Sequence, residues 1–387
     1  MMQKDRQMEM VAKTFPGLEK VLAREINQIG GKEIEILNRA VRFFGDKSIL
    51  YRSNLYLRTA LRILVPVIKN KIKTQIDLYT RVKEYEWEKH LMPGMTLAVD
   101  TFLSSSTFTH SHFVSLRTKD AIADRLREKF NRRPSVNKTN PDLFVNVHLA
   151  NNALIVSIDT SGSSLHKRGY RRADFEAPIN EVLAAGLILL SGWRGDTDFY
   201  DPMCGSGTIG IEASLIARQI PPGIFRTRFG FEKHQDFEET LWKNIYDDIQ
   251  EKEWDGKIYA SDISKHALKI ATVNAKNASV LKNIEYKEID FRNFPKISNG
   301  GTVIINPPYG ERLSDSQIIS FYRIMGDVLK KSFTAAEVWI ISSNFNALKH
   351  VGLRPVEKYK LYNGALECRY NKYEIYSGSR KGKYRNT

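Results

Sequence analysis

The sequence predicts an α/β chain whose C-terminal half forms a doubly wound, mostly parallel sheet, with smaller α+β units before it. Beyond about residue 175, strand-like apolar runs alternate with helical segments. Glycine-rich or acidic segments follow the ends of these strands. A length of 387 residues also exceeds what one core usually organises, so two or three domains are expected.

The most informative segment is Asn306-Pro307-Pro308-Tyr309, which follows the apolar strand 302–305. An asparagine amide oxygen and a rigid turn carbonyl can together accept both hydrogens of an exocyclic amine, while a neighbouring ring stacks on the base that carries it. The segment therefore predicts a chain that modifies a base. These four residues are the catalytic candidates.

A second segment lies upstream, after the strand-like run 197–200. Its glycines let backbone amides approach a ligand closely, and the helix expected over 208–218 begins at the same point. The glycine spacing departs from the dinucleotide pattern G-x-G-x-x-G, and the acidic residue expected about twenty positions later is missing, which disfavours nicotinamide. A nucleoside cofactor fits this turn, which consists of Asp201, Pro202, Met203, Cys204, Gly205, Ser206, Gly207 and Thr208.

Acidic residues also end the next two strands, expected over 258–262 and 284–289. Asp262 could accept both ribose hydroxyls, although capping a helix that starts near Ser264 is the commoner role for Asp at such a place. Asp290 could accept from an adenine amino group, with Phe291 beside the ring. Because the carboxyl ends of parallel strands meet at one edge, these segments are expected to converge.

This order of segments resembles class I S-adenosylmethionine-dependent methyltransferases of the amino-methylating kind, over roughly residues 175–375. The resemblance implies a Rossmann-like methyltransferase fold with a seven-stranded, mostly parallel sheet. It also implies S-adenosylmethionine as the cofactor, with its methionine portion at the glycine turn, its ribose at Asp262, its adenine at Asp290 and the target amine at Asn306. The cofactor-binding candidates are Asp201, Met203, Cys204, Gly205, Ser206, Gly207, Thr208, Asp262, Ile263, Asp290, Phe291 and Asn306.

The remaining elements of this half are a helix over 315–332, a strand over 337–342 and a closing hairpin over 361–376. A helix starts near Pro178; in related enzymes such a segment flanks the cofactor, and a plain helix start is an equally good interpretation. The aromatic insert 229–242 could help to hold substrate, but burial against the helix layer is favoured. Cys204 is interpreted as a small buried residue rather than a nucleophile.

Two smaller units precede this half. The first is ferredoxin-like in its order of elements, with a strand at 10–15, a helix at 17–29, a strand at 33–44, a helix at 47–57 and a strand at 62–68. The second has a helix at 74–87, a strand at 96–102, a helix at 112–130 and strands at 143–149 and 154–159. Asn151-Asn152 suits the last turn, since Asn tolerates positive φ.

The second unit and the basic segment 164–172 after it resemble THUMP domains, which are RNA-binding modules joined to methyltransferases. A charge run is more often a solvated face, but this one lies beside the expected catalytic domain. The RNA-binding candidates are Arg117, Lys119, Arg132, Arg133, Lys167, Arg168, Tyr170, Arg171 and Arg172. The predicted domains are 1–71 (ferredoxin-like), 72–160 (THUMP), 161–176 (linker), 177–376 (methyltransferase) and 377–387 (basic tail).

Composition agrees with a nucleic-acid partner. The net charge of +15, the pI near 9.5 and the 11% of aromatic residues suit contact with phosphates and bases, although anionic membranes attract the same charge. No run of eighteen apolar residues and no signal-peptide core occur, so no membrane segment is expected. Two cysteines and the isolated pair His110 and His112 predict a cytoplasmic chain without a metal site.

Taken over residues 1–376, the chain resembles THUMP-containing RNA guanine-N2 methyltransferases, particularly the bacterial enzymes that act on 23S ribosomal RNA. Their archaeal and eukaryotic relatives act on tRNA, which is one alternative substrate. Methylation of adenine N6, even in DNA, is a second alternative, because the motif recognises an amine rather than a whole base. The third alternative is a non-catalytic RNA-binding factor for ribosome assembly.

Overall fold

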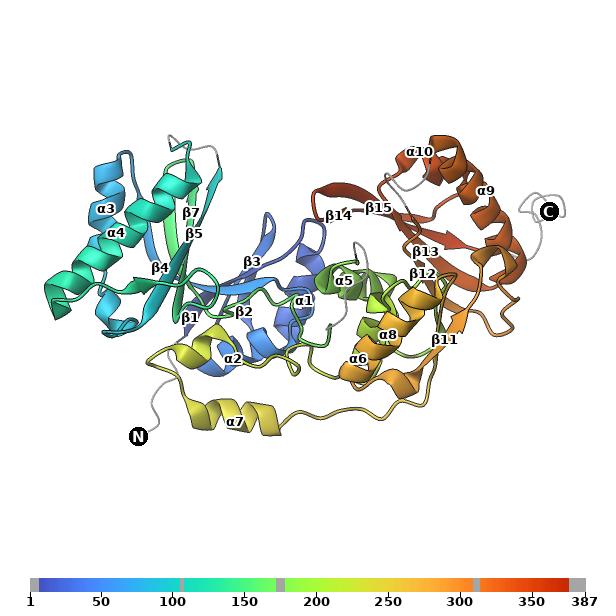
Figure 1. Cartoon of the computed structure of the whole chain (residues 1–387), viewed down its shortest axis with the longest axis horizontal. Coiled ribbons are helices and arrows are strands. Elements are labelled where there is room, and N and C mark those ends of the chain that lie inside the picture. Colours follow the sequence, from blue (N-terminus) through green and yellow to red (C-terminus); the bar gives the residue numbers. More distant parts are fainter. Residues whose placement is uncertain (1–6, 105–107, 172–177, 309–313, 376–387) are drawn as a thin grey trace. The chain divides into compact units, whose positions relative to one another are not determined.

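Two compact units make up the chain, each with its own sheet and its own core (Figure 1). Unit 1 holds Met1–Thr14, Leu22–Lys167 and Arg226–Asp248, and unit 2 holds Phe15–Val21, Arg168–Phe225 and Ile249–Thr387. The computed structural model describes residues 7–104, 108–171, 178–308 and 314–375.

Unit 1 is built on an eight-stranded sheet in the order β2-β3-β1-β4-β8-β7-β5-β6. Its strands are β1 (Met8–Lys13), β2 (Lys32–Leu37), β3 (Ala40–Gly45), β4 (Arg62–Lys71), β5 (Thr96–Ser104), β6 (Ser135–Val136), β7 (Leu143–Ala150) and β8 (Ala153–Asp159). Antiparallel pairing of β4 with β8 joins the two small modules that the sequence predicts, so they share one continuous sheet.

The helices of unit 1 pack against this sheet or against one another. They are α1 (Glu19–Gln28), α2 (Lys47–Tyr56), α3 (Gln75–Glu84), α4 (Ser111–Phe130) and α7 (Glu239–Asp247), with 3₁₀ turns η1 (Trp87–Lys89) and η2 (Gly230–Lys233). Leu78 of α3 and Ile122 of α4 pack in one cluster with Val145 of β7. Alternate residues of β7 are buried, as expected of a strand with one face on a core.

Two of the predicted elements in unit 1 differ from the structure. The single strand expected over 33–44 is a pair of strands, β2 and β3, separated by a turn in which Arg39 has a φ of +58°. The helix expected to reach Trp87 ends at Glu84, and Trp87 instead begins η1. The predicted turn at Asn151-Asn152 is confirmed, because both residues have positive φ.

Unit 2 is built on a seven-stranded sheet in the order β11-β10-β9-β12-β13-β15-β14. Its strands are β9 (Phe199–Asp201), β10 (Ile258–Asp262), β11 (Ile284–Glu288), β12 (Gly301–Ile305), β13 (Ala336–Ser342), β14 (Glu357–Asn363) and β15 (Leu366–Glu374). The first five strands of that order are parallel, and β15 runs antiparallel to both β13 and β14. The predicted seven-stranded, mostly parallel sheet is confirmed.

The order of these strands reverses at β9. From β9 the chain passes to β10 and then β11 on one side, whereas β12 and β13 lie on the other side. In doubly wound sheets such a reversal opens a crevice beyond the carboxyl ends of the strands, where ligands bind. The four segments that the sequence singles out follow the strands on either side of this reversal.

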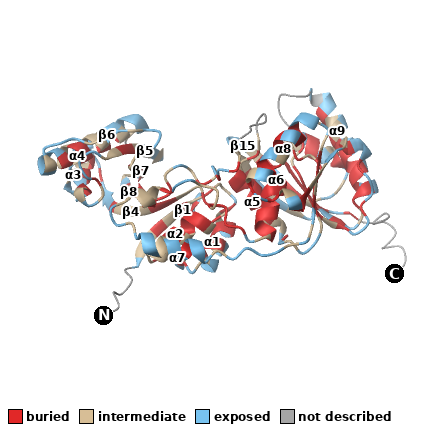
Figure 2. Cartoon of the chain, turned by 60° about the horizontal axis from the view of Figure 1, so that its bottom comes forward, coloured by how far each residue is buried: buried red, intermediate tan, exposed pale blue. Residues whose placement is uncertain are grey.

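Helices of unit 2 cover the sheet. They are α5 (Glu181–Ser191), α6 (Thr208–Ala217), α8 (Lys265–Asn277), α9 (Asp315–Ser332) and α10 (Phe345–Leu348), with 3₁₀ turns η3 (Leu281–Asn283), η4 (Phe291–Asn293) and η5 (Lys349–Val351). Every residue of α6 is buried, and α6 and α5 are therefore largely red in Figure 2. Tyr322 and Met325 of α9 pack in one cluster with Val303 of β12.

The aromatic insert leaves the catalytic half of the sequence and packs within unit 1. The ring of Phe231 stacks on Tyr51 of α2 with 4.4 Å between centroids, and Trp242 meets Phe231 edge-on at 5.2 Å. Lys47 pairs with Glu238 at 3.0 Å. Burial of these aromatic residues agrees with the favoured interpretation, and the helices that they meet, α2 and α7, belong to unit 1.

Candidate functional site

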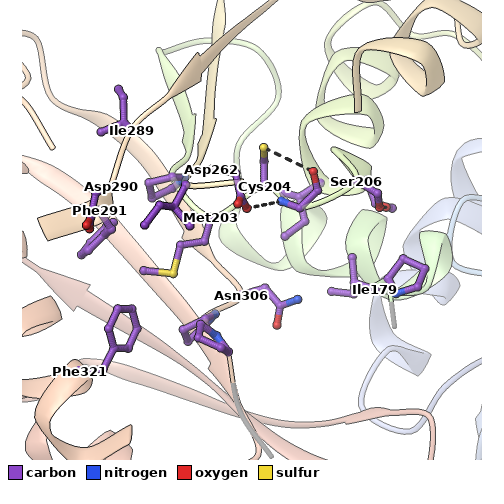
Figure 3. A pocket seen from close by; sticks show the side chains of 18 of the residues that line it. Ile179, Met203, Cys204, Ser206, Asp262, Ile289, Asp290, Phe291, Asn306 and Phe321 are labelled. Atoms are coloured by element: carbon purple, nitrogen blue, oxygen red, sulfur yellow. Dashed lines mark hydrogen bonds between the residues drawn. The ribbon is translucent and has the colours of Figure 1, made fainter. Parts of the chain in front are cut away.

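A cavity of about 760 Å³ in unit 2 brings together the segments that follow β9, β10, β11 and β12 (Figure 3). It has the size of a small-molecule site. The residues that line it are Pro178, Ile179, Pro202, Met203, Cys204, Gly205, Ser206, Thr208, Ile209, Asp262, Ile263, Ile289, Asp290, Phe291, Arg292, Asn306, Pro307, Pro308, Gln317, Ser320, Phe321, Ile324, Asn363 and Leu366.

Most of the predicted catalytic and cofactor-binding residues therefore meet in one place. Of the cofactor candidates, Asp201 and Gly207 are the two that do not line the cavity. Tyr309, the last catalytic candidate, lies outside the described residues. Convergence follows from the parallel strands, which bring segments distant in sequence to one edge.

Two glycines shape the turn between β9 and α6. Gly205 has a φ of +52° and nothing lies within 4 Å of the place where a β-carbon would stand, so its backbone is open to the cavity. Gly207 has a φ of +81°, and a β-carbon there would lie 2.8 Å from the Tyr286 hydroxyl. Both positions favour glycine, and the first amides of α6 begin directly after them.

Asp262 holds this turn to the end of β10. Its Oδ2 accepts a hydrogen bond from the backbone nitrogen of Gly205 at 2.9 Å (Figure 3), and its Oδ1 accepts from that of Ser264 at 2.9 Å. Ser264 itself caps α8 by accepting from Ala267. Because each carboxylate oxygen carries more than one lone pair, Asp262 keeps acceptor capacity toward the cavity.

Asp201 is a buried carboxyl group next to the site. Burial, reinforced by the nearby Asp262 carboxylate, raises the pKa of Asp201 to about 8. Backbone amides of Met203 and Gly210 oppose that rise, but neither carboxylate oxygen has a well-formed hydrogen bond within the described chain. The group is therefore mostly protonated at neutral pH and lies behind the glycine turn rather than on the cavity wall.

The adjacent wall carries Asp290 and Phe291 at the end of β11. Arg292 donates from its Nε to Asp290 Oδ2 at 2.9 Å, and this hydrogen bonding lowers the pKa of Asp290 below its ordinary value. Phe291 is buried, and its ring stacks on Phe333 with 6.1 Å between centroids. Asp290 is thus a fixed anion at the cavity, with Phe291 as the apolar surface beside it.

Asn306 carries an unsatisfied acceptor. Its Oδ1 is buried and has no hydrogen-bond partner among the described residues, although its side chain lies on the cavity wall (Figure 3). A buried amide oxygen without a partner is unfavourable by about 1–3 kcal/mol, so a donor from a ligand would be stabilised here. Pro307 is buried and Pro308 is exposed on the same wall.

The buried thiol of Cys204 lies on the cavity wall. Burial raises the pKa of the Cys204 thiol well above its usual range, and the carboxylates of Asp201 and Asp262 add to the rise. A thiol of that kind is a poor nucleophile. Within the described chain, no group of three or more His, Cys, Asp or Glu residues could hold a metal ion. The helices of the described residues include none with the length and apolar character of a membrane span.

Other cavity residues were not predicted from the sequence. Gln317, Phe321 and Ile324 recur at the spacing of one face of α9, a signal that the helical periodicity of 315–332 contains. Asn363 and Leu366 flank the tip of the β14–β15 hairpin, and no local motif marks them. The cavity thus extends past Asn306 toward α9 and this hairpin.

Five of the basic candidates for RNA contact lie in unit 1, two of them half-buried and three exposed. Arg132 is exposed, and Arg133 is also exposed while it pairs with Asp124 at 2.6 Å. The guanidinium of Arg117 lies 4.3 Å from the ring centroid of Tyr79, and Lys119 pairs with Asp120 at 3.0 Å. Lys167, at the end of this unit, is exposed as well.

Three further candidates have other partners. Arg168 and Tyr170 are 2% and 1% exposed, and both contact Glu212 of α6, which leaves them almost no surface for the predicted contact with RNA. Arg171 is largely buried and donates to Thr208 and to the carbonyl of Ile179. Residues 168–171 look like a basic patch in the sequence because their acidic partner Glu212 lies about forty positions further along the chain. Arg172 lies outside the described residues.

A family profile described as "RMKL-like, methyltransferase domain" matches residues 168–372, more than half of the chain. This chain belongs to that family. A THUMP domain profile matches residues 73–159, and a profile for the RlmL ferredoxin-like domain matches residues 9–64. The family resemblance predicted from the motifs is thereby confirmed, and the cavity is that of a methyltransferase domain.

Relatives of known name extend over the same residues. The protein slr0064 of Synechocystis, assigned as an RNA methyltransferase, is 35% identical over 364 residues, which cover 93% of this chain and 95% of that protein. The ribosomal RNA large subunit methyltransferase K/L of a Shewanella species is 35% identical over 371 residues, or 94% of this chain and 52% of that protein. The chain therefore spans about half the length of the K/L relatives.

Solved structures agree with this family. SMU.472, assigned as a methyltransferase and crystallised with SAH, has a TM-score of 0.85 at 31% identity, covering 97% of this chain and 100% of that chain. A Listeria monocytogenes protein named an N6-adenine-specific DNA methylase has a TM-score of 0.83 at 32% identity, covering 96% and 97%. TrmN from Thermus thermophilus, at 20% identity and a TM-score of 0.69, shows the same fold.

Proposed function

We propose that this chain transfers a methyl group from S-adenosylmethionine to the exocyclic N2 amine of guanosine in RNA, with 23S ribosomal RNA as the substrate. The observation that carries the proposal is the unpaired Oδ1 of Asn306 on the wall of a cavity that also holds the glycine turn and two carboxylates. The K/L relatives support the choice of ribosomal RNA.

The cavity suits the cofactor. Gly205 leaves open space where any other residue would place a β-carbon, and Asp262 lies beside it with acceptor capacity for hydroxyl groups. Asp290, Phe291 and Ile263 offer an acceptor and two apolar surfaces for a heteroaromatic ring. The related SMU.472 holds SAH, the product form of the same cofactor.

When it is bound, S-adenosylmethionine supplies an electrophilic methyl group on its sulfonium. Asn306 Oδ1 and the Pro307 carbonyl accept the two hydrogens of the target amine and so aim its lone pair. A conjugated amine is a poor nucleophile, so orientation and stabilisation of the positive charge that develops on its nitrogen carry the rate. Tyr309 is assigned to stacking on the base, and the reaction needs no covalent intermediate with the enzyme.

RNA binding is assigned to unit 1, which carries the THUMP match, the half-buried residues Arg117 and Lys119, and the exposed residues Arg132 and Arg133. Contacts of this kind neutralise phosphates and position the RNA, leaving the choice of base to the cavity. A guanosine in structured RNA must leave its stack, at a cost of a few kcal/mol. We expect the protein to act in the cytoplasm.

A second candidate function is methylation of adenine N6. The Listeria relative is named for that activity on DNA, and an unpaired amide oxygen accepts from either exocyclic amine. A tRNA substrate and a non-catalytic role in ribosome assembly are further alternatives. The proposal of catalysis has the better support because the cavity retains Asp262, Asp290 and Asn306 together.

Transfer of labelled methyl to total RNA that lacks the modification tests the proposal. The chain and its Asn306→Ala variant are incubated with labelled S-adenosylmethionine, the RNA species are separated, and the nucleosides are analysed by mass. Labelled N2-methylguanosine in 23S RNA, dependent on Asn306, is the expected result. Labelled N2-methylguanosine in tRNA would instead support a tRNA substrate, and labelled N6-methyladenosine would support methylation of adenine. RNA binding without transfer would support the non-catalytic role in ribosome assembly.

A further inference from the structure

The chain that follows unit 1 runs along helix α6 of unit 2. The hydroxyl of Tyr170 donates to Glu212 Oε1 at 3.0 Å, and Arg168 Nε lies 3.5 Å from the same oxygen. Arg171 Nη2 donates to Thr208 Oγ1 at 2.9 Å. Thr208 and Glu212 are four residues apart and therefore share one face of α6. Residues 168–171 thus follow the helix back toward its first residue.

This course is fixed by close packing. Gly169 has a φ of +111°, and a β-carbon there would lie 2.1 Å from the carbonyl oxygen of Phe225, so only glycine fits. Asn277 of α8 donates to the Tyr170 carbonyl at 3.1 Å. The segment is therefore a packed part of unit 2, and the guanidinium of Arg171 has a defined position within it.

Arg171 joins two walls of the cavity. The Nη2 that donates to Thr208 also donates to the Ile179 carbonyl at 3.1 Å, and both Thr208 and Ile179 line the cavity. Its Nε lies 3.4 Å from Glu181 Oε1, at the start of α5. Arg171 itself does not line the cavity. It therefore stands behind the wall and holds its two sides together.

The direction of the hydrogen bond to Thr208 has a chemical consequence. A guanidinium carries only donors, so the Thr208 hydroxyl must accept from Arg171, and its own proton must point elsewhere. The proton can reach Ser206 Oγ at 3.5 Å or a group inside the cavity. Thr208 also begins α6, where free backbone N–H groups favour a negative charge. Donors directed at this point suit an anion.

We propose that Arg171 is a positioning residue of the cofactor site, which makes the Thr208 hydroxyl a donor to the carboxylate of the bound cofactor. This inference rests on the proposed use of S-adenosylmethionine, whose amino-acid end carries that carboxylate. It gives the segment 168–171 a role in cofactor binding in place of the RNA contact expected from its charge.

The test compares two ligands that differ at the amino-acid end. S-adenosylhomocysteine carries the carboxylate, whereas 5′-methylthioadenosine keeps the adenosine and sulfur and lacks the amino acid. Affinities of the full chain for both are measured by calorimetry, for the unaltered protein and for Arg171→Met, Thr208→Val and the double variant. Lys269→Gln, which removes an exposed charge of α8, is the matched control.

Arg171→Met should weaken S-adenosylhomocysteine binding about tenfold, as expected for loss of one oriented hydrogen bond, and leave 5′-methylthioadenosine within about twofold. Thr208→Val should act in the same way, and the double variant should bind no more weakly than Thr208→Val, because the two residues act through one hydroxyl. Lys269→Gln should change neither affinity.

Unchanged binding of S-adenosylhomocysteine by Arg171→Met would overturn the inference, as would an equal loss of both ligands, which marks a role in folding alone. Failure of the proposed use of S-adenosylmethionine gives a different result, because then the unaltered chain would bind neither ligand. Thermal unfolding of each variant accompanies the titrations and separates a loss of contacts from a loss of fold.

Discussion

The Oδ2 of Asp262 accepts a hydrogen bond from the backbone nitrogen of Gly205 at 2.9 Å, which ties the end of β10 to the glycine turn after β9. The same carboxylate accepts from Ser264 through its other oxygen. The sequence left two roles open for Asp262, a contact with ribose and the start of a helix. In the structure Ser264 is the N-cap of α8, so Asp262 contacts the start of that helix without capping it, and its carboxylate stays on the cavity wall.

Substitution of Asp262 should weaken cofactor binding. Asp262→Ala removes the acceptor for Gly205 as well as the proposed acceptor for ribose, so we expect a loss of about ten- to a hundredfold in affinity for S-adenosylhomocysteine. Calorimetric titration measures this loss. Asp262→Asn keeps one acceptor oxygen, so its affinity should fall between those of the unaltered chain and Asp262→Ala. Normal binding by Asp262→Ala would show that Asp262 does not contact the cofactor.

Asn306 should affect turnover rather than cofactor affinity. Asn306→Ala deletes the buried acceptor Oδ1, and loss of one such oriented group typically lowers a rate by about 10²–10³. Single-turnover methyl transfer measures the rate, and calorimetry with S-adenosylhomocysteine supplies the control. An unchanged rate would contradict the proposed contacts with the amine. Asp262→Ala should instead lose cofactor affinity first, so the two variants distinguish cofactor binding from contact with the amine.

Asp201 should make stability depend on pH. Burial raises the pKa of this carboxyl to about 8 in the folded chain, whereas an unfolded Asp titrates at about 3.9. Between these values the folded state binds more protons, so this contribution to the free energy of unfolding is present below about pH 4 and is lost as pH rises through about 8. Asp201→Asn should remove this decline in the free energy of unfolding with rising pH.

Urea unfolding at pH 5 and pH 8 measures this contribution. We expect the asparagine variant to be more stable than the unaltered chain at pH 8, by on the order of a few kcal/mol, and closer to it at pH 5. Both proteins share every other titrating group, so their difference isolates Asp201. Parallel curves for the two proteins would show that the buried carboxyl is not protonated in the folded chain.

The strand-end segments could be predicted because each is local in sequence and parallel strands bring such ends together. The roles of Arg168 and Tyr170 could not, since Glu212, which removes them from solvent, lies 42 positions beyond Tyr170. The same limit applies to Phe231, whose stacking partner Tyr51 belongs to the N-terminal part of the chain. Local patterns identify residue chemistry, but distant packing decides whether it faces solvent.

The aromatic insert should stabilise unit 1. Phe231 is 1% exposed and packs on both Tyr51 and Trp242, so Phe231→Ala should lower the free energy of unfolding by about 3–5 kcal/mol. Denaturant unfolding followed by tryptophan fluorescence measures it. Tyr246→Ala is a suitable control because Tyr246 belongs to α7, the helix that contains Trp242, and is 43% exposed. Equal effects of the two substitutions would argue against a packed role for Phe231.

RNA affinity should depend on the exposed arginines of unit 1, and point variants test this better than deletion of residues 1–160. Such a deletion would expose Phe231 and would also remove Leu18, which is buried in unit 2 against Gly186. Arg132→Ala changes an exposed side chain only. We expect it to weaken binding by a similar factor for RNAs of different sequence, because phosphate contacts carry no base information.

The salt dependence of that affinity identifies the kind of contact. Loss of one phosphate contact should reduce the slope of log affinity against log salt concentration by about 1, and Arg132→Ala combined with Arg133→Ala should reduce it by about 2. Fluorescence anisotropy with labelled RNA at several salt concentrations measures both slopes. The Arg194→Ala variant of unit 2 controls for a general effect of lost charge. A slope that stays unchanged in the double variant would place the RNA on another surface of the chain.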